Sequence, residues 1–89
     1  MDMVLNGCVL ANCQLAEIRR FNLFLRHATL TQCELLSCNF SGSHFDHAEF
    51  SRCRLYDCNF ANADLPSVNF ADCELRRVKF IGANLRGAN

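Results

Sequence analysis

Apolar side chains recur at every fifth position along almost the whole chain. From Leu5 to Leu85 each of these centre positions holds Leu or Phe, and Arg20 is the single exception. A second series of apolar or small residues runs two positions before the centres, and polar residues occupy most positions between the two series. A period of five matches neither an α-helix, with about 3.6 residues per turn, nor a long strand, whose side chains alternate. The pattern therefore predicts a chain that turns after every five residues.

Turn-forming residues stand where this interpretation needs a corner, two residues after a centre, and such residues tolerate or favour bent backbone. The one proline, Pro66, follows the centre Leu65, where its fixed φ suits a turn. We interpret each unit as a short straight side, with its centre and the residue two before it pointing inward, followed by a corner. Stacked turns of such units form a solenoid. The predicted corners include Gly7, Asn12, Asn22, Ser37, Gly42, Asp57, Asn62, Ser67, Asp72, Gly82 and Gly87.

Several of the five-residue units carry a family motif, in which Asn or Asp stands between a small residue and the centre. These units are Cys38-Asn39-Phe40, Cys58-Asn59-Phe60, Ala63-Asp64-Leu65, Val68-Asn69-Phe70 and Ala83-Asn84-Leu85. In this motif the chain resembles the pentapeptide-repeat proteins, over essentially its whole length. The resemblance implies an all-β fold, a right-handed quadrilateral β-helix with four repeats in each coil. The repeats present would give about four coils.

Residues twenty positions apart share their character, which supports a coil of that length. Neighbouring coils would lie about 4.8 Å apart, the usual spacing of strands, so that like side chains stack on like. We therefore expect one domain over residues 1–89 with a continuous rod as its core. The predicted inward columns are Cys13, Cys33, Cys53 and Cys73; Leu15, Leu35, Leu55 and Leu75; and Phe40, Phe60 and Phe80.

Two parts of the chain depart from the regular pattern. A guanidinium has no place in a dry core without a partner, so we expect an irregular first coil over 16–25, with Phe21 replacing Arg20 inside. This departure is either a partner-contacting loop or a distorted first coil, and we favour the second. The chain also stops inside a repeat, and uncapped coils expose core and open strand edges. We expect either a segment of a longer array or end-to-end pairing of two copies.

All seven cysteines occupy the inward series, interchangeably with Ala, Val and Ser. We interpret them as small buried packing groups, because free cysteine is among the most buried residue types. Stacked thiols point the same way, which disfavours the disulfide dihedral. The odd number of cysteines and the absence of Cys-x-x-Cys pairs argue against zinc. Free thiols in turn indicate a reduced, cytoplasmic setting.

The sequence offers no nucleophile and base set, no paired carboxylates and no phosphate loop, so we expect neither enzyme activity nor a cofactor. His27 and His47 should stack at a corner with His44 nearby. A surface metal site is conceivable there, but we favour a solvated trio because nothing in the sequence specifies oriented partners for metal ligands. No apolar run approaches the length of a membrane span, so no membrane association is expected.

The charges bear on the best-known activity of the resembling family, which is to bind DNA gyrase or topoisomerase IV as a mimic of DNA and protect it from quinolones or toxins. Such a mimic needs an acidic surface, because the partner's site is built for phosphate. Nine acidic and nine basic residues leave no net charge here, and no predicted side carries an uninterrupted acidic stripe. The basic residues form no groove with interleaved aromatic residues, so direct nucleic-acid binding is not expected either.

We therefore favour a non-enzymatic protein-binding or structural module, bacterial and cytoplasmic, with topoisomerase protection as the alternative. Ala16, Leu36 and Tyr56 should form an outward apolar column of the kind found at contact sites, although scattered surface apolar residues explain the same pattern. The candidate partner-binding residues are Leu36, Tyr56, Phe21 and Phe24.

Overall fold

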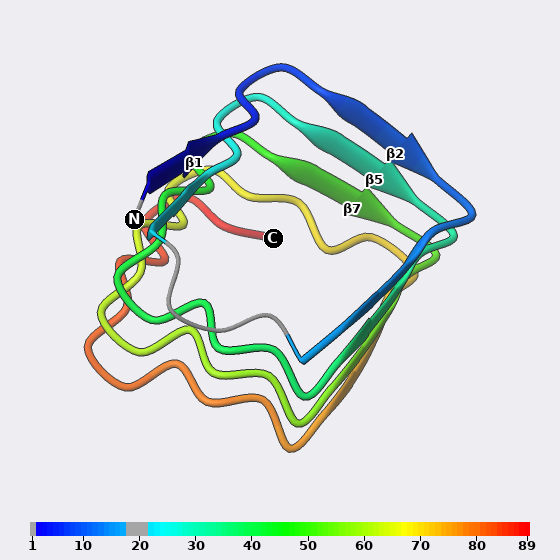
Figure 1. Ribbon diagram of the computed structural model, residues 1–89. Coiled ribbons are helices and arrows are strands. Elements are labelled where there is room, and N and C mark those ends of the chain that lie inside the picture. The colour runs from blue at the N-terminus through cyan, green and yellow to red at the C-terminus, as the bar shows by residue number, and fades with distance from the viewer. Residues whose placement is uncertain (1, 18–21) are drawn as a thin grey trace.

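The chain winds into a stack of four-sided coils in the computed structural model, which describes residues 2–17 and 22–89 (Figure 1). The chain runs clockwise in this view as it recedes from the viewer, so the coil is right-handed. Within the described residues every strand pairing is parallel, and each named strand is three residues long. The predicted all-β, right-handed quadrilateral β-helix of about four coils is confirmed.

Three sides of the coil carry named strands, and the fourth is held by single-residue bridges. One side pairs β1 (Asp2–Val4) with β4 (Asn22–Phe24) and continues through bridges at His44, Asp64 and Asn84. The fourth side has bridges that join Asn39, Asn59 and Lys79. The second side holds β2 (Val9–Ala11), β5 (Thr29–Thr31) and β7 (Glu49–Ser51), and the third holds β3 (Gln14–Ala16), β6 (Glu34–Leu36), β8 (Arg54–Tyr56) and β9 (Glu74–Arg76).

The register between neighbouring coils is twenty residues, as the sequence predicts. Leu15 pairs with Leu35, Leu35 with Leu55, and Leu55 with Leu75. Short strands form because the chain keeps an extended side only long enough to place one centre, flanked by two outward side chains, before it turns. The described residues form no helix, so none is long and apolar enough to cross a membrane.

The core is a rod of stacked Leu, Phe and small side chains. Phe60 is fully buried, and its ring centroid lies 5.1 Å from that of Phe40 and 5.5 Å from that of Phe80. Burial depends on being covered from both sides, because Leu55 is 0% exposed whereas Leu75, in the same column, is 41% exposed. The inward positions therefore give a dry core only where another coil lies on each side.

The residue two after a centre is the corner residue, and φ there lies between 51° and 74°. This holds at every such position from Gly7 to Gly87 except Asn22. Left-handed backbone is costly for most residues, yet these corners include side chains that do not favour it. The prediction of a corner at Asn22 is wrong. Asn22 is extended and pairs with Asp2, because the β1–β4 ladder begins two residues earlier than the rest of this side. The predicted exchange of Phe21 for Arg20 falls on 18–21, outside the described residues.

An asparagine before the centre marks a closed corner. After Asn39, the N–H of Ser43 donates to the carbonyl of the centre Phe40 (3.0 Å). The Oδ1 of Asn39 accepts the N–H of Ser41 (3.0 Å), so the side chain satisfies a backbone donor inside the turn. The same N–H to Asn Oδ1 bond forms at Ala61, Ala71 and Arg86.

Cysteine thiols donate hydrogen bonds to the backbone carbonyls of centre residues on the second and third sides of the coil. The thiol of Cys53 donates to the carbonyl of Leu30 (3.3 Å), and that of Cys58 to the carbonyl of Leu35 (3.2 Å), in each case one coil earlier. Cys33, Cys38, Cys53 and Cys58 are buried, and all seven cysteines are free thiols. The predicted inward placement of these side chains is confirmed, and the hydrogen bonds give a reason for cysteine over alanine at these positions.

Candidate functional site

One side of the coil offers an ordered set of outward side chains. The outward residues of β3, β6, β8 and β9, together with the corner residues Asp57 and Arg77, form the surface that we call the β3–β9 face. They point outward because side chains alternate along a strand and the centres point in. Each outward residue pairs with the residue twenty positions later, in the next coil, so the outward side chains form columns.

The predicted apolar column is present on this face. Ala16 pairs with Leu36, Leu36 with Tyr56, and Tyr56 with Arg76. Leu36 and Tyr56 are half-buried, and the Arg76 guanidinium lies 5.4 Å from the centroid of the Tyr56 ring. A cation over an aromatic ring is attracted by the ring quadrupole, which orders both side chains. The sequence pattern identified the first three members and did not identify Arg76 as the fourth.

A second column alternates in charge, with Glu34 opposite Arg54 and Arg54 opposite Glu74. Arg54 Nη1 lies 3.6 Å from Glu34 Oε2, and Arg76 Nη2 lies 2.7 Å from Glu74 Oε1. The hydroxyl of Tyr56 donates to Glu74 Oε2 (2.9 Å). This hydrogen bond raises the pKa of Tyr56 and lowers the pKa of Glu74. The two columns are therefore linked into one network of fixed side chains.

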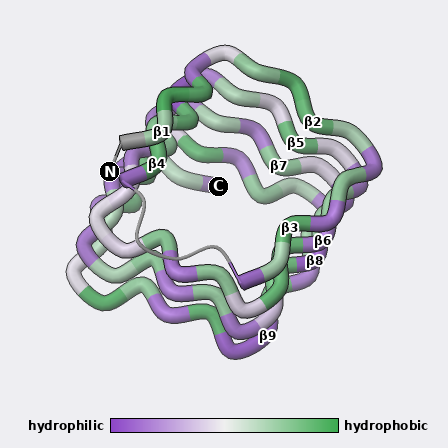
Figure 2. Tube along the Cα trace, viewed as in Figure 1, coloured by the Kyte–Doolittle hydropathy of each residue, from purple (hydrophilic) through white to green (hydrophobic). Residues whose placement is uncertain are grey.

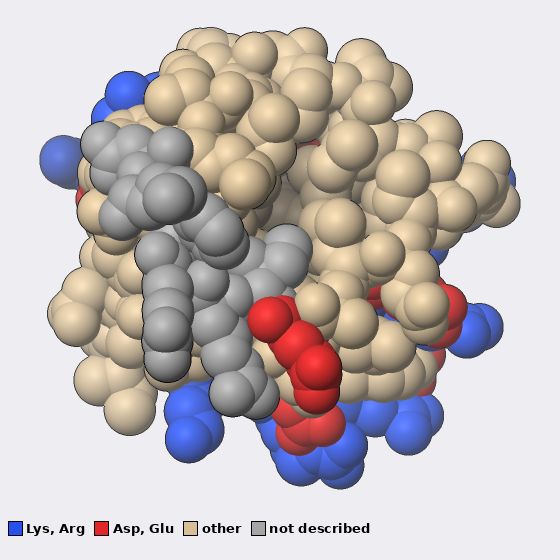
Figure 3. Space-filling view, in the orientation of Figure 1, with Lys and Arg blue, Asp and Glu red and all other residues tan. Residues whose placement is uncertain are grey.

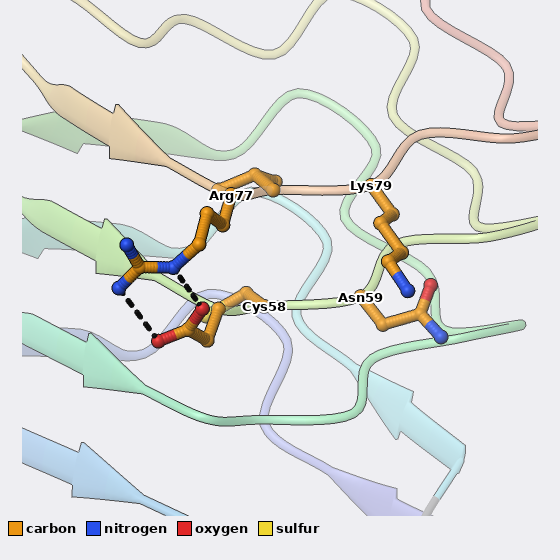
Figure 4. Close-up of a pocket in the computed structure, with 6 residues that line it drawn as sticks. Cys58, Asn59, Arg77 and Lys79 are labelled. Carbon is orange, nitrogen blue, oxygen red and sulfur yellow. Dashed lines mark hydrogen bonds and ion pairs between the residues drawn. The ribbon is translucent and has the colours of Figure 1, made fainter.

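The corner after β8 and β9 carries a shallow pocket of about 500 Å³ (Figure 4). On one wall Arg77 Nη2 donates to Asp57 Oδ2 (3.1 Å), and Arg77 lowers the pKa of Asp57. On the other wall Lys79 extends toward Asn59 from the next coil. A second hollow of about 280 Å³, at the opposite edge of the β3–β9 face, is lined by Gln32, Cys33, Glu34, Arg52 and Arg54.

The thiols in these hollows have raised pKa values. The pKa of Cys58, in the first pocket, is raised by its contact with the Cys38 thiol and by burial. Burial also raises the pKa of Cys33, in the second. The thiolate is the reactive form of cysteine, so a raised pKa lowers its reactivity. The two hollows therefore suit recognition of polar groups better than covalent chemistry.

The remaining candidate residues do not join this surface. Phe24 lies in β4, on the side of the coil opposite the β3–β9 face (Figure 2). Its ring stacks with that of His44 at a centroid distance of 4.6 Å, and the Arg26 guanidinium lies 5.5 Å from its centroid. Phe21 lies outside the described residues. Of the three candidates that the structure describes, it brings Leu36 and Tyr56 together and places Phe24 elsewhere.

The histidines divide into two groups. His27 and His47 stack as expected, with ring centroids 5.1 Å apart. His44 instead lies against Asp64, with Nδ1 2.8 Å from Oδ2. Of the residues that the structure describes, the one set that brings three metal-ligating side chains together is His44, Asp46 and Asp64. The expected trio of histidines is therefore not a single cluster, and the prediction did not include the two aspartates that lie beside His44.

The visible charges are interspersed rather than separated by sign. Figure 3 shows acidic and basic side chains side by side along the lower right of the molecule, where β9 lies in Figure 2. The upper side, formed by β2, β5 and β7, is mostly uncharged in the same view. Its outward side chains include Val9, Ala11, Thr29, Thr31, Glu49 and Ser51.

Solved structures similar to this one include proteins that are described as pentapeptide repeat proteins. Rfr23, a pentapeptide repeat protein from the cyanobacterium Cyanothece, is 14% identical, with a TM-score of 0.57 over 97% of this chain and 87% of that chain. Trypsin-treated QnrB1, a plasmid-mediated fluoroquinolone resistance protein, is 20% identical, with a TM-score of 0.56 over 94% of this chain and 48% of that chain. HetL, a pentapeptide repeat protein involved in heterocyst differentiation regulation in the cyanobacterium Nostoc, is 23% identical, with a TM-score of 0.50 over 97% and 46%.

These likenesses concern the fold, and the chain spans about half the length of QnrB1 and HetL. No curated protein matches the sequence. The family model for the pentapeptide repeat region, however, matches residues 23–89, which is most of the chain. This protein therefore belongs to the pentapeptide-repeat family.

Proposed function

We propose that this protein is a non-enzymatic module that binds another protein through its β3–β9 face. The observation that carries the proposal is the column of Leu36, Tyr56 and Arg76 on neighbouring strands. Tyrosine and arginine are enriched at the centres of protein interfaces. Tyr56 is already held by Glu74 and Arg76, so binding would cost little additional side-chain entropy.

The paired charges of this face support a protein partner over a nucleic acid. Glu34, Arg54 and Glu74 alternate along one column, so the face offers both signs of charge at close spacing. A phosphate backbone would favour a surface of basic residues alone, whereas a protein can match mixed charges. We further propose a cytoplasmic location, where the seven free thiols would stay reduced.

An interaction screen with matched variants tests this function. Tyr56→Ala removes the aromatic ring from the centre of the β3–β9 face, and Thr29→Ala truncates an outward side chain on the mostly uncharged side formed by β2, β5 and β7. We expect a partner that cross-links to the wild type and to Thr29→Ala and is lost with Tyr56→Ala, while both variants keep the melting temperature. A partner retained equally by both variants would place the binding surface elsewhere.

Topoisomerase protection is the second candidate, and the likeness in fold to the fluoroquinolone resistance protein QnrB1 favours it. The charge pattern weighs against it, because an acid on the β3–β9 face is repeatedly paired with an arginine. A gyrase supercoiling assay with and without a quinolone separates the two candidates. Recovery of supercoiling on addition of this protein would replace the first proposal.

Contact between coil ends is a further part of the proposed assembly. The inward residues Met3 and Leu5 of the first coil are 39% and 37% exposed, and the centres Leu75 and Leu85 near the other end of the stack are each 41% exposed. We propose that two copies of the chain pair through such end surfaces, which would cover apolar area. Light scattering over a range of concentrations tests this pairing. A strict monomer at every concentration would contradict it.

A further inference from the structure

We propose that His44, Asp46 and Asp64 form a binding site for a divalent metal ion of the zinc class. The site lies on the side that carries β1 and β4, opposite the β3–β9 face. His44 and Asp46 flank the centre Phe45, so both side chains point outward. Asp64 is the bridge partner of His44 in the next coil. The fold therefore brings three ligands from two coils to one place.

The distances suit a metal ion with small side-chain adjustments. One ligand atom from each of the three residues lies within 4.8 Å of the others, and His44 Nδ1 lies 2.8 Å from Asp64 Oδ2. Zinc binds imidazole nitrogen and carboxylate oxygen at about 2.0–2.2 Å, which requires neighbouring ligand atoms roughly 3–3.5 Å apart. We expect rotation about the side-chain bonds of the aspartates to bring the ligand atoms to this spacing.

Two of the ligand atoms are shielded from solvent without a hydrogen bond among the described residues. These atoms are His44 Nδ1 and Asp46 Oδ1. Each lies within ion-pair distance of a neighbour, Asp64 for the first and Arg26 for the second, but the Arg26 contact at 3.6 Å is too long for a hydrogen bond and the Asp64 contact does not form one either. Shielded polar atoms without hydrogen bonds are costly and uncommon in folded proteins. A cation bound between them would satisfy both atoms at once.

The neighbouring coil fixes the orientation of the imidazole ring. The Phe24 ring lies one coil earlier and stacks on His44 with an interplanar angle of 14°. This stacking holds the plane of the ring, and Nδ1 lies on the edge that faces Asp64. Orientation of a ligating histidine by a neighbouring group is a regular feature of metal sites.

Arg26 is the natural competitor of the metal ion. Its Nε lies 3.6 Å from Asp46 Oδ1, and its guanidinium lies over the Phe24 ring. A bound cation and this guanidinium would repel each other, because both lie close to the same carboxylate. We expect Arg26 to turn toward solvent when the metal ion binds, and its removal to increase the affinity.

The ligand types of the site indicate which metal ion it would bind. One imidazole nitrogen with two carboxylates suits zinc and cobalt, whereas calcium takes six to eight oxygen ligands and magnesium keeps several waters. Three protein ligands leave at least one coordination position for water or for a donor from another molecule. The bound ion would link two coils across the side that carries β1 and β4.

Titration of the reduced full chain with Co²⁺ and Zn²⁺ tests the site. Calorimetry should give one ion per chain, and the Co²⁺ complex should lack the intense near-ultraviolet band of a cobalt–thiolate bond. Asp64→Asn should weaken binding at least tenfold without unfolding the protein, because asparagine occupies the equivalent position at Asn84. His44→Gln should do the same, and Arg26→Ala should tighten binding.

His47→Gln is the matched control, because His47 belongs to the separate stack with His27 and should leave the affinity unchanged. Three results would overturn the proposal: no stoichiometric binding, equal affinity of Asp64→Asn and the wild type, or loss of binding in His47→Gln. A thiolate band in the Co²⁺ spectrum would also overturn it, since the ion would then be held by cysteine.

Discussion

The thiol of Cys58 lies 3.2 Å from the carbonyl oxygen of Leu35, one coil earlier, and donates a hydrogen bond to it. Contact with the Cys38 thiol and burial raise the pKa of Cys58 above its ordinary value of 9.0. Burial also raises the pKa of Cys33, Cys53 and Cys73. The core therefore depends on thiols that remain protonated.

These pKa shifts predict that the protein loses stability at alkaline pH. A thiol whose pKa is raised in the folded chain contributes its full stability below the pKa of the unfolded chain, and loses this contribution as pH rises above it. We expect the free energy of unfolding to be flat between neutral pH and pH 9.0 and to fall above it. Urea unfolding across this range measures the effect. Cys58→Ala should show a shallower fall, and an identical slope would contradict the assignment.

Removal of the ring of Phe60 should destabilise the protein by about 3–5 kcal/mol, because a large cavity would form inside the stack. Phe60 is 0% exposed and contacts the rings of Phe40 and Phe80. Arg54→Ala is the control, since its side chain is 60% exposed and surface substitutions usually change stability by less than about 0.5 kcal/mol. Thermal and urea unfolding of both variants measure the difference. Equal effects would contradict the inward placement of Phe60.

The period of five predicted the columns of the core. Four repeats of five residues make one coil, so each centre is covered by the centre twenty residues away. Corners with unfavourable residues, such as Glu17 and Arg52, could not be predicted from residue type. Closure of the coil imposes left-handed backbone on whatever residue stands there. The extended Asn22 depends on its pairing with Asp2, which residue type does not reveal.

The proposed metal site was within reach of the sequence. His44 and Asp64 are twenty residues apart, so the predicted register already placed them side by side. The stack of His27 on His47, also twenty residues apart, follows from the same register. Asp46 joins them because residues on either side of a centre both point outward. The contact between Arg26 and Asp46 could not be predicted in this way, because a repeat pattern does not show how a long side chain is oriented.

The amide side chain of Asn59 should stabilise its corner by about 0.5–1.5 kcal/mol, the usual net contribution of one hydrogen bond. Its Oδ1 accepts the N–H of Ala61 at 2.9 Å. Asn59→Ala removes this acceptor, whereas Lys79→Ala changes the next residue of the same ladder and removes no such bond in the described structure. Hydrogen exchange at the Ala61 amide provides the local readout. We expect faster exchange in Asn59→Ala alone, and equal exchange in both variants would contradict the role of the side chain.

Left-handed backbone, rather than lack of space, should explain the glycine at position 42. Its φ is 71°, and a Cβ added there would meet no atom within 4 Å. Gly42→Ala should therefore cost about 1–2 kcal/mol through backbone conformation alone.

Gln32→Gly is the reciprocal change at a corner with φ of 53°. It should relieve a similar strain, partly offset by the greater entropy of glycine in the unfolded chain. Urea unfolding of both variants should show opposite signs, because the corner requires the same backbone at both positions. A loss of stability in Gln32→Gly as large as that in Gly42→Ala would mean that side-chain contacts, and not backbone strain, decide which residues stand at the corners.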